Sequence, residues 1–223
     1  MQATFTEENY IKAIFKLHEK TAKEAVNTND IALELNMKAA SVTDMIKRLS
    51  DKKLITYKKY YGVSLTKKGN EIALDVIRKH RLWEVFLVKK LNFKWDEVHD
   101  IAEQLEHINS KELINKLDDF LGNPKFDPHG DVIPSRDGKM KALTSFPLSS
   151  ITKKQKLLFS GLLNHEPKFL QHLSSIDIQL GSSIEIESYN DFDRSYKIKI
   201  NNKHLEFMSE TIASHLLVQK YDK

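Results

Sequence analysis

The sequence predicts a mainly α-helical protein with α+β parts, in which the last third forms a small β-barrel. Apolar residues recur at helical spacing through most of residues 6–121. A basic pair of short β-type runs interrupts them at residues 54–66, and short alternating runs dominate after residue 150. The 223 residues can form three small domains. We expect these domains at residues 1–70, 71–145 and 146–223.

The composition is that of a globular protein without thiol chemistry. Hydrophobic residues make up 40% and charged residues 30%, which excludes a disordered chain. Because cysteine is absent, any bound metal must be held by nitrogen and oxygen atoms. The first residues lack the layout of a signal peptide, and no apolar run approaches the ~18 residues of a membrane span. We therefore expect a cytoplasmic protein with no membrane partner.

The net charge of +4 is concentrated in the first third of the chain. Residues 1–70 contain 13 Lys and Arg against 8 Asp and Glu, whereas the remainder is nearly neutral. This imbalance favours an anionic partner for the first third. By charge alone, lysines solvated on helix surfaces explain the imbalance equally well.

The first seventy residues have the pattern of a winged helix-turn-helix. Apolar spacing indicates helices over residues 6–20, 29–36 and 39–53, the last two joined by a tight link. Two short helices joined in this way, the second with small polar residues at its start, form a helix-turn-helix. The basic hairpin over residues 54–66 follows the third helix directly, as a wing does.

Local signals mark where these elements begin and turn. Thr6 can cap the first helix, and two glutamates follow it in the first turn, where the helix dipole favours negative charge. Asn29 or Asp30 can open the second helix. Gly62 suits the turn of the hairpin.

The third helix and the wing supply the candidate DNA contacts. Ser41 and Thr43 stand at the start of the third helix, where side chains meet base edges or phosphates, and Asp44 can accept from a cytosine amino group. Basic residues on the helix and wing would neutralise phosphates. The candidate set is Ala40, Ser41, Thr43, Asp44, Lys47, Arg48, Lys58, Lys59 and Tyr60. A winged helix that makes only protein contacts remains the alternative.

Two helices in the middle of the chain gather histidines and carboxylates. The first is expected over residues 66–91, where His80 and Glu84 are four residues apart and hence on one face. The second is expected over residues 96–108. On it, an arc of about 100° contains four polar residues. These are His99, Glu103, Glu106 and His107.

Imidazole and carboxylate without cysteine favour Mn²⁺ or Fe²⁺, with Zn²⁺ or Co²⁺ able to substitute in vitro. A single such face would be interpreted as a solvated acidic surface. Two on successive helices favour a metal site instead. A two-metal hydrolase can use similar ligands. Because no nucleophile or substrate pocket is evident, we expect no enzymatic activity.

The following helix, over residues 110–121, has a wider apolar stripe than one small domain needs. Together with apolar residues before it, this stripe is our candidate dimer surface, and an ordinary intradomain core is the alternative. The candidate residues are Leu91, Phe93, Leu105, Leu113, Leu117, Phe120 and Leu121.

The last hundred residues read as a linker followed by a barrel. Residues 122–148 are rich in Pro, Gly and Asp. Within them His129 can act as a ligand, although turn packing is the preferred interpretation. A helix is expected over residues 167–176. Short alternating runs, which suggest a small barrel, cover residues 155–163, 182–190, 194–201 and 203–210.

In order along the chain, several segments resemble the diphtheria-toxin-repressor family of iron- and manganese-dependent transcriptional regulators. They are TEENYIKAI, SVTDMIKRL, YGVSLTKKG, KHRLWEVFL, VHDIAEQLEHI and PHGDVIP. The resemblance covers essentially the whole chain, and the ordered set is specific although each motif alone is weak. The segment from residue 176 resembles the SH3-like (FeoA-type) domain of longer members.

The resemblance implies two metal positions per subunit. His80, Glu84 and His99 would form one. Asn9 would complete the other, together with Glu103, Glu106 and His107. Glutamate at position 103 favours Mn²⁺, because manganese-type members resemble one another in having glutamate there and iron-type members in having cysteine. Asn9 offers only a neutral amide oxygen and Lys12 would repel a nearby second cation, so the metal and the number of ions stay open.

The resemblance also implies a mechanism. A homodimer would repress metal-uptake genes by binding double-stranded operator DNA when metal fixes the angle between the first helix and the middle domain. Without metal, the carboxylates should repel one another and loosen that arrangement. The alternative is a winged-helix regulator that senses an organic ligand or a protein. Asn164, His165 and Glu166 lie near the place from which longer members supply ligands, without a firm assignment.

Overall fold

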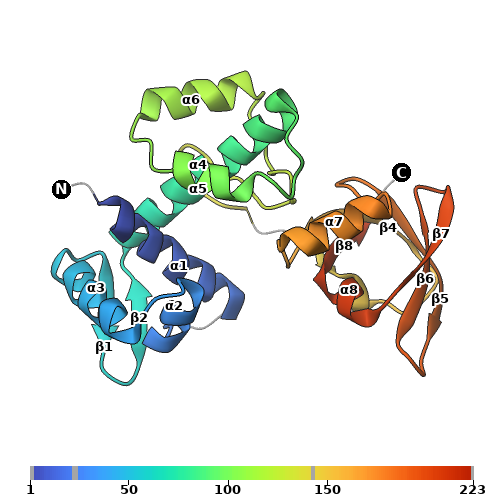
Figure 1. The fold of residues 1–223 in the computed structure, drawn as a ribbon, viewed down its shortest axis with the longest axis horizontal. Coiled ribbons are helices and arrows are strands. Elements are labelled where there is room, and N and C mark those ends of the chain that lie inside the picture. Colours follow the sequence, from blue (N-terminus) through green and yellow to red (C-terminus); the bar gives the residue numbers. More distant parts are fainter. Residues whose placement is uncertain (1–2, 22–24, 142–143, 222–223) are drawn as a thin grey trace. The chain divides into compact units, whose positions relative to one another are not determined.

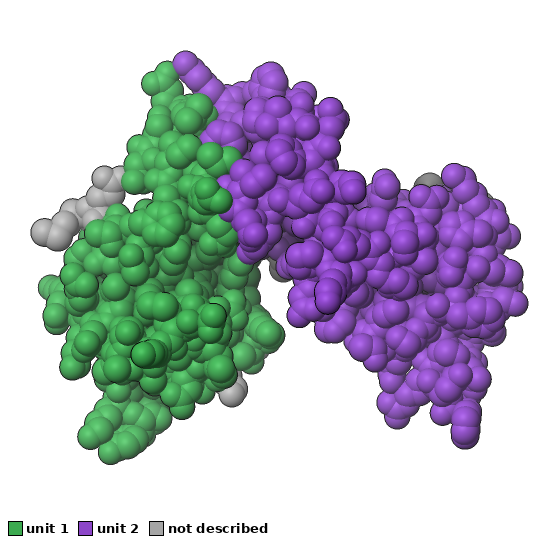
Figure 2. Space-filling model, viewed as in Figure 1, with its two compact units in different colours: residues 1–80, 103–115, 134–140 green, residues 81–102, 116–133, 141–223 purple. Residues whose placement is uncertain are grey.

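The computed structural model describes residues 3–21, 25–141 and 144–221 (Figure 1). The chain divides into two compact units, each described by itself (Figure 2). The first unit comprises residues 1–80, 103–115 and 134–140, and the second comprises residues 81–102, 116–133 and 141–223. Three helices, α4 (Lys67–Leu91), α5 (His99–Leu105) and α6 (Lys111–Phe120), contribute residues to both units.

The first unit contains the predicted winged helix-turn-helix. Its helices and strands, in chain order, are α1 (Phe5–Thr21), α2 (Thr28–Glu34), α3 (Ala39–Asp51), β1 (Ile55–Lys58), β2 (Gly62–Leu65) and the start of α4 (Lys67–Leu91). Strands β1 and β2 pair antiparallel, with Ile55 opposite Leu65 and Lys58 opposite Gly62. This hairpin directly follows α3, as expected for a wing.

A single apolar core holds these elements together. Ile14 of α1, Ile31 of α2 and Ile46 of α3 are almost fully buried in it, as is Val63 of the wing. Burying each such side chain contributes about 1.5–3 kcal/mol. Gly62 has φ +110°, and a Cβ there would lie 2.5 Å from the carbonyl oxygen of Val26. The wing therefore requires glycine at this turn.

The helix starts differ from those expected. Helix α1 begins at Phe5, and its cap is Thr4 rather than Thr6. The Thr4 hydroxyl accepts from the Glu7 amide, and the Glu7 carboxylate accepts from the Thr4 amide at 2.9 Å. Helix α2 is capped by Asn27, whose side chain accepts from the Asp30 amide. In both cases an equally suitable polar residue stands a few positions earlier in the sequence.

The second unit joins helical segments to a small β domain. Its helical parts are the end of α4, the start of α5 (His99–Leu105) and the end of α6 (Lys111–Phe120). Helix α5 is shorter than the expected 96–108. Residues 121–133 follow as irregular chain with one bridge, Phe126 to Val132. Residues 142–143, within the predicted linker, lie outside the described residues.

The β domain is the predicted SH3-like domain. Its six-stranded antiparallel sheet has the order β3-β8-β4-β5-β6-β7. The elements are β3 (Phe146–Pro147), η1 (Leu148–Ser150), β4 (Lys156–Leu162), α7 (Pro167–Ser175), β5 (Ser183–Asn190), β6 (Ser195–Ile200), β7 (His204–Met208), α8 (Glu210–His215) and β8 (Leu216–Lys220). Register shifts in β4 and β5 mark bulges, which bend strands.

The core of the β domain lies between the sheet and its helices. Phe159 of β4 and Tyr196 of β6 are among its largest fully buried side chains, and Leu173 of α7 packs with them. Strand β8 pairs with both β3 and β4 and so joins the edge strand β3 to the rest of the sheet. Among the described helices of the whole chain, none combines the length and apolar character needed to cross a membrane.

Candidate metal centre

A buried lysine lies at the centre of the first group of ligand-type residues. Lys12 of α1 is 5% exposed. Its Nζ donates to Glu103 Oε1 at 2.5 Å and to both oxygens of Glu106, at 2.6 and 2.8 Å. Glu103 lies on α5, and Glu106 follows its end and is fully buried. The name lysine cluster is used for these three residues together with His80 and His107, which lie near Glu106, Glu8, which pairs with His107, and Asn9, three positions before Lys12 on α1.

His107 in this cluster is oriented as a metal ligand is. Its Nδ1 lies 2.6 Å from Glu8 Oε2, so Nδ1 donates to the carboxylate and Nε2 is the ring nitrogen left to bind an ion. Nε2 is buried without a hydrogen-bond partner, 3.6 Å from Glu106 Oε1. The ring packs on Phe5, with 3.7 Å between centroids. A nearly buried imidazole nitrogen is therefore available as a donor atom.

Asn9 supplies a second donor atom of this kind. Among the described side chains, Asn9 Oδ1 is one of four buried polar atoms without a hydrogen-bond partner, and His107 Nε2 is another. A buried polar atom without a partner costs about 1–3 kcal/mol, so its presence needs a reason. Both atoms fit an oxygen- and nitrogen-binding divalent ion.

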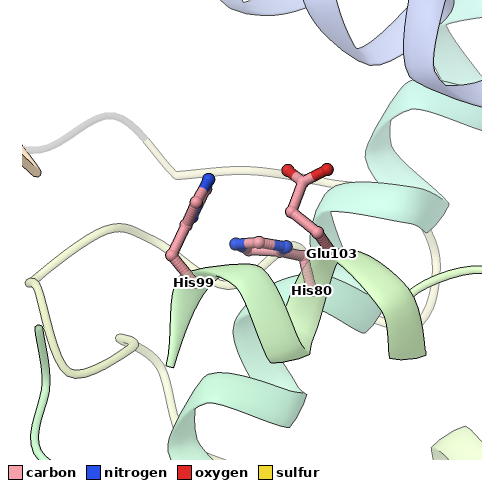
Figure 3. A group of neighbouring side chains, drawn as sticks. All are labelled: His80, His99 and Glu103. Carbon is pink, nitrogen blue, oxygen red and sulfur yellow. The ribbon is translucent and has the colours of Figure 1, made fainter. Parts of the chain in front are cut away.

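His80 also adjoins the lysine cluster. Its Nδ1 lies 2.6 Å from Glu106 Oε2, and the side chain is nearly buried. Figure 3 shows His80 on α4 beside Glu103 on α5, with His99 one turn before Glu103 on the same helix. One ligand atom from each of the three lies within 4.8 Å of the others. Imidazole and carboxylate groups at this spacing can bind a divalent ion.

A second group, which we call the acidic cluster, consists of Glu84, Asp127 and His129. All three are buried, and one ligand atom of each lies within 4.8 Å of the others. His129 Nε2 donates to the Trp95 carbonyl at 2.8 Å, which directs Nδ1 toward Glu84 Oε2 at 3.7 Å. Asp127 Oδ1 accepts from the amides of His129 and Asp131. The short loop after α6 is thereby folded against α4.

Electrostatics within the acidic cluster favour bound protons in the absence of a cation. Burial, with the nearby charges of Asp131 and Glu84, raises the pKa of Asp127 to about 8. Burial lowers the pKa of His129, but the hydrogen bond and charge of Glu84 and the charge of Asp127 outweigh it and raise the pKa to about 9. Carboxylates brought this close need a proton or a cation.

Residues of the β domain approach the acidic cluster from within the same unit. The His165 ring lies 5.1 Å from that of His129, and its Nε2 lies 3.9 Å from Asp131 Oδ2. Arg81 of α4 also contacts Asp131, at 3.1 Å, and lies 3.7 Å from Asp127. His165 is thus the residue among 164–166 that reaches the neighbourhood of this cluster.

The structure sets further residues beside those of the first expected ligand set. Glu84 lies close to Asp127 and His129, whereas His80 is hydrogen-bonded to Glu106. His99 Nδ1 is 3.8 Å from Glu84 Oε1. Asp127 was missed by the sequence reasoning and His129 was interpreted as turn packing. The signal that could have found them is an Asp and a His two residues apart in a Pro- and Gly-rich loop. The ligand sets themselves stay predictions.

The candidate DNA contacts form one exposed set on α3 and the wing. Every one of the nine predicted residues is exposed, and Tyr60, at φ +70°, is 91% exposed. Thr43 Oγ1 donates to the Ala39 carbonyl, which leaves its oxygen able to accept. Lys59 Nζ lies 5.1 Å from the centroid of the Tyr60 ring. Tyr61, not predicted, is 80% exposed beside it.

The candidate dimer residues divide by exposure. Leu91, Phe93, Leu113 and Phe120 are exposed, whereas Leu117 is buried at 7%. The remaining two, Leu105 and Leu121, are half-buried. Phe120 is 62% exposed, with Lys90 Nζ 4.8 Å from its ring centroid. Exposed apolar side chains mark an interface where they form one contiguous patch.

Three family profiles match the chain in order. The iron dependent repressor N-terminal DNA binding domain matches residues 3–63, and the iron dependent repressor metal binding and dimerisation domain matches residues 66–135. The FeoA domain matches residues 146–220. The order is that predicted from the sequence.

Known proteins match parts of the chain. The iron-dependent repressor IdeR of Mycobacterium tuberculosis is 33% identical over 129 residues, which are 58% of this chain and 55% of that protein. A probable metal transport system membrane protein of Chlamydia trachomatis is 46% identical over 76 residues, 34% of this chain and 17% of that protein. The chain therefore spans about half the length of IdeR and a smaller share of the transport protein.

Solved structures extend the likeness to nearly the full chain. A manganese-dependent transcriptional repressor in complex with manganese has a TM-score of 0.85 at 29% identity, covering 96% of this chain and all of that one. The manganese regulator SloR is 31% identical, with a TM-score of 0.75, and the match covers 99% of this chain and all of SloR. The chain belongs to the diphtheria-toxin-repressor family of metal-dependent transcriptional repressors.

Proposed function

We propose that this chain is a repressor of metal-uptake genes that binds double-stranded operator DNA as a homodimer when activated by Mn²⁺ or Fe²⁺. The observation that carries the proposal is the pair of buried donor atoms without partners, Asn9 Oδ1 and His107 Nε2. Asn9 lies on α1 of the winged helix, whereas His107 follows α5. An ion held by both would tie the helix-turn-helix to the helix that carries the carboxylates.

The donor set supports Mn²⁺ as the preferred ion. Asn9, Glu103, Glu106 and His107 would hold one ion, with only nitrogen and oxygen donors. Glu84, Asp127 and His129 would hold another, and His80 and His99 are further candidate ligands. When bound, the ion supplies positive charge where buried carboxylates gather. The solved relatives include one described as a complex with manganese, which favours a metal over an organic effector.

The DNA-binding proposal rests on exposure and charge. Lys47, Arg48, Lys58 and Lys59 are exposed on α3 and the wing, where they can neutralise phosphates. Ser41, Thr43 and Asp44 are exposed on the first turns of α3 and can meet base edges.

We also propose that the exposed apolar residues around α6, Phe120 foremost, form the dimer surface. The domain boundaries near residues 70 and 145 are part of the proposal, supported by the limits of the three family profiles. A regulator of this kind works in the cytoplasm and has no catalytic activity.

The test is DNA binding at controlled metal occupancy. Fluorescence anisotropy with DNA from upstream of metal-uptake genes should show tight binding with Mn²⁺ or Fe²⁺ and its loss on adding a chelator. Because linkage is reciprocal, operator DNA should also tighten metal binding. Equal DNA binding with and without chelator would exclude metal activation.

Two classes of DNA contact can be separated in the same assay. Lys58→Ala should weaken binding to all sequences and reduce the slope of log affinity against log salt by about one. Ser41→Ala should instead change the preference among operator variants. Identical effects from both substitutions would contradict the assignment of phosphate contacts to the wing and of base contacts to α3.

A further inference from the structure

Lys12 has the surroundings that a metal ion would have. Its ammonium contacts three carboxylate oxygens from two glutamates at 2.5–2.8 Å. The second carboxylate, Glu106, is fully buried and also lies 2.6 Å from His80 Nδ1. A cation enclosed by carboxylate oxygens with an imidazole behind them is the arrangement that divalent ions adopt in proteins. Here the cation belongs to the chain.

The backbone holds Lys12 in this place. Its neighbours Ile11 and Ala13 are buried, Ile11 completely, so α1 cannot turn the lysine outward without exposing its own core face. A buried ammonium is costly unless paired, and both glutamates pair with it. The expected repulsion between the carboxylates is therefore already offset without metal.

One donor without a hydrogen-bond partner, His107 Nε2, lies near a glutamate that pairs with this lysine. His107 Nε2 is 3.6 Å from Glu106 Oε1, the same oxygen that accepts from Lys12 at 2.6 Å. The His107 side chain is 8% exposed. Glu106 Oε1 thus lies near both the lysine ammonium and the imidazole nitrogen that has no hydrogen-bond partner. A divalent ion beside His107 and a second ion between Glu103 and Glu106 would require the lysine to leave.

We propose that Lys12 is an internal cation that occupies the place between Glu103 and Glu106 and limits the lysine cluster to one divalent ion. The proposal rests on the proposed metal activation and adds a stoichiometry-determining residue to it. The single ion is held on the side of Asn9 Oδ1 and His107 Nε2. The lysine keeps Glu103 and Glu106 together whether or not that ion is bound.

The test counts Mn²⁺ ions in the full chain and its variants by isothermal titration calorimetry and equilibrium dialysis. Lys12→Glu replaces the cation by a ligand and should bind one Mn²⁺ per chain more than the parent. Adding Glu103→Gln to that variant should remove the extra ion. Lys12→Met removes the charge at similar length and should tighten Mn²⁺ binding by about tenfold, because a repelling charge is gone.

Lys52→Met is the matched control. Lys52 Nζ is also paired with a buried glutamate of α1, Glu7 at 2.6 Å, but neither residue contacts Glu103 or Glu106 in the contacts described above. It should change neither the number of ions nor their affinity. Circular dichroism checks that each variant folds, and the Lys12→Met comparison carries the test if Lys12→Glu does not.

The outcomes separate two failures. Equal ion counts for the parent and a folded Lys12→Glu, or equal Mn²⁺ affinities for the parent and Lys12→Met, would overturn the role of Lys12 while leaving metal activation intact. No Mn²⁺ binding by the parent would instead overturn the proposed function.

Discussion

The lysine cluster and the acidic cluster solve the same electrostatic problem in different ways. Each gathers carboxylates in a buried place. In the lysine cluster, the Lys12 ammonium contacts both glutamates directly. In the acidic cluster, burial and neighbouring acids raise the pKa of Asp127, and Glu84 raises that of His129, so protons offset part of the charge.

The difference teaches what an incoming metal ion must displace. At the acidic cluster it displaces protons, whose cost depends on pH. At the lysine cluster it must share Glu106 with an ammonium that the helix holds in place. The two clusters should therefore respond differently to pH and to substitution.

The largest expected effect is on the stability of the lysine cluster. Glu106→Ala leaves Lys12 with one carboxylate in a buried place and should lower the free energy of unfolding by about 3–5 kcal/mol. Denaturant unfolding without metal measures it. Glu34→Ala, an exposed glutamate of α2, is the control and should change stability by less than about 0.5 kcal/mol. A small loss in Glu106→Ala would mean that the lysine does not need this partner.

The next effect concerns a lysine–glutamate pair outside both clusters. Lys52→Met leaves the Glu7 carboxylate without its lysine and should cost about 1–2 kcal/mol, since Lys52 is partly exposed. Burial raises the pKa of Glu7, but Lys52 and Thr4 outweigh it and place the pKa below 4.5.

The pH dependence of this pair follows from that direction. The contribution to stability is fully present above about pH 4.5 and is lost as pH falls through the folded-state pKa. Unfolding midpoints of parent and Lys52→Met should therefore converge in acid. A constant difference down to low pH would show that the variant acts through packing.

The third effect is the pH dependence of metal binding at the acidic cluster. Because the raised pKa values of Asp127 and His129 keep protons bound near neutrality, Mn²⁺ affinity there should rise about tenfold per pH unit for each proton displaced. Calorimetry in buffers of different ionisation enthalpy counts the protons released. Asp127→Asn should flatten the dependence, whereas Lys12→Met should not. An unchanged slope in Asp127→Asn would remove Asp127 from the site.

The smallest effect is expected at the β domain. His165→Ala should weaken Mn²⁺ binding at the acidic cluster by about two- to threefold, because it removes an imidazole near Asp131 and His129 without removing a buried ligand. His172→Ala, on α7 and exposed, is a matched control. A loss of more than about tenfold would make His165 a direct ligand rather than a neighbour.

The winged helix and a small β-barrel were predictable from the sequence, because apolar spacing and turn residues are local signals. The SH3-like type of that barrel followed only from the family resemblance. Helix α8 and strand β8 escaped prediction, since residues 210–220 lack a long periodic run and β8 forms by pairing with β3 and β4. The caps Thr4 and Asn27 were missed because several polar residues near each start can fill that role.

The candidate site was predictable as a set of residues but not as two groups. Spacing on one helix placed Glu103, Glu106 and His107 together. Only the tertiary structure could bring Lys12 between two glutamates more than ninety positions away, or set Asp127 against Glu84 across a loop. The sequence indicates only that Lys12 would repel a second cation. Its pairing with Glu103 and Glu106 depends on burial, which no local pattern reveals.

Trp95 gives the acidic cluster an optical signal of its own. Its indole lies nearly parallel to the His129 ring, with 15° between the planes and 6.1 Å between centroids, and its Nε1 donates to Ser174 Oγ. The chain has two tryptophans, and the other, Trp83, can be replaced by phenylalanine. The fluorescence of Trp95 should then change when His129 is protonated or binds an ion. It should not change when an ion binds near Lys12. The two clusters can thus be titrated in one sample, the acidic cluster by fluorescence and the lysine cluster by calorimetry.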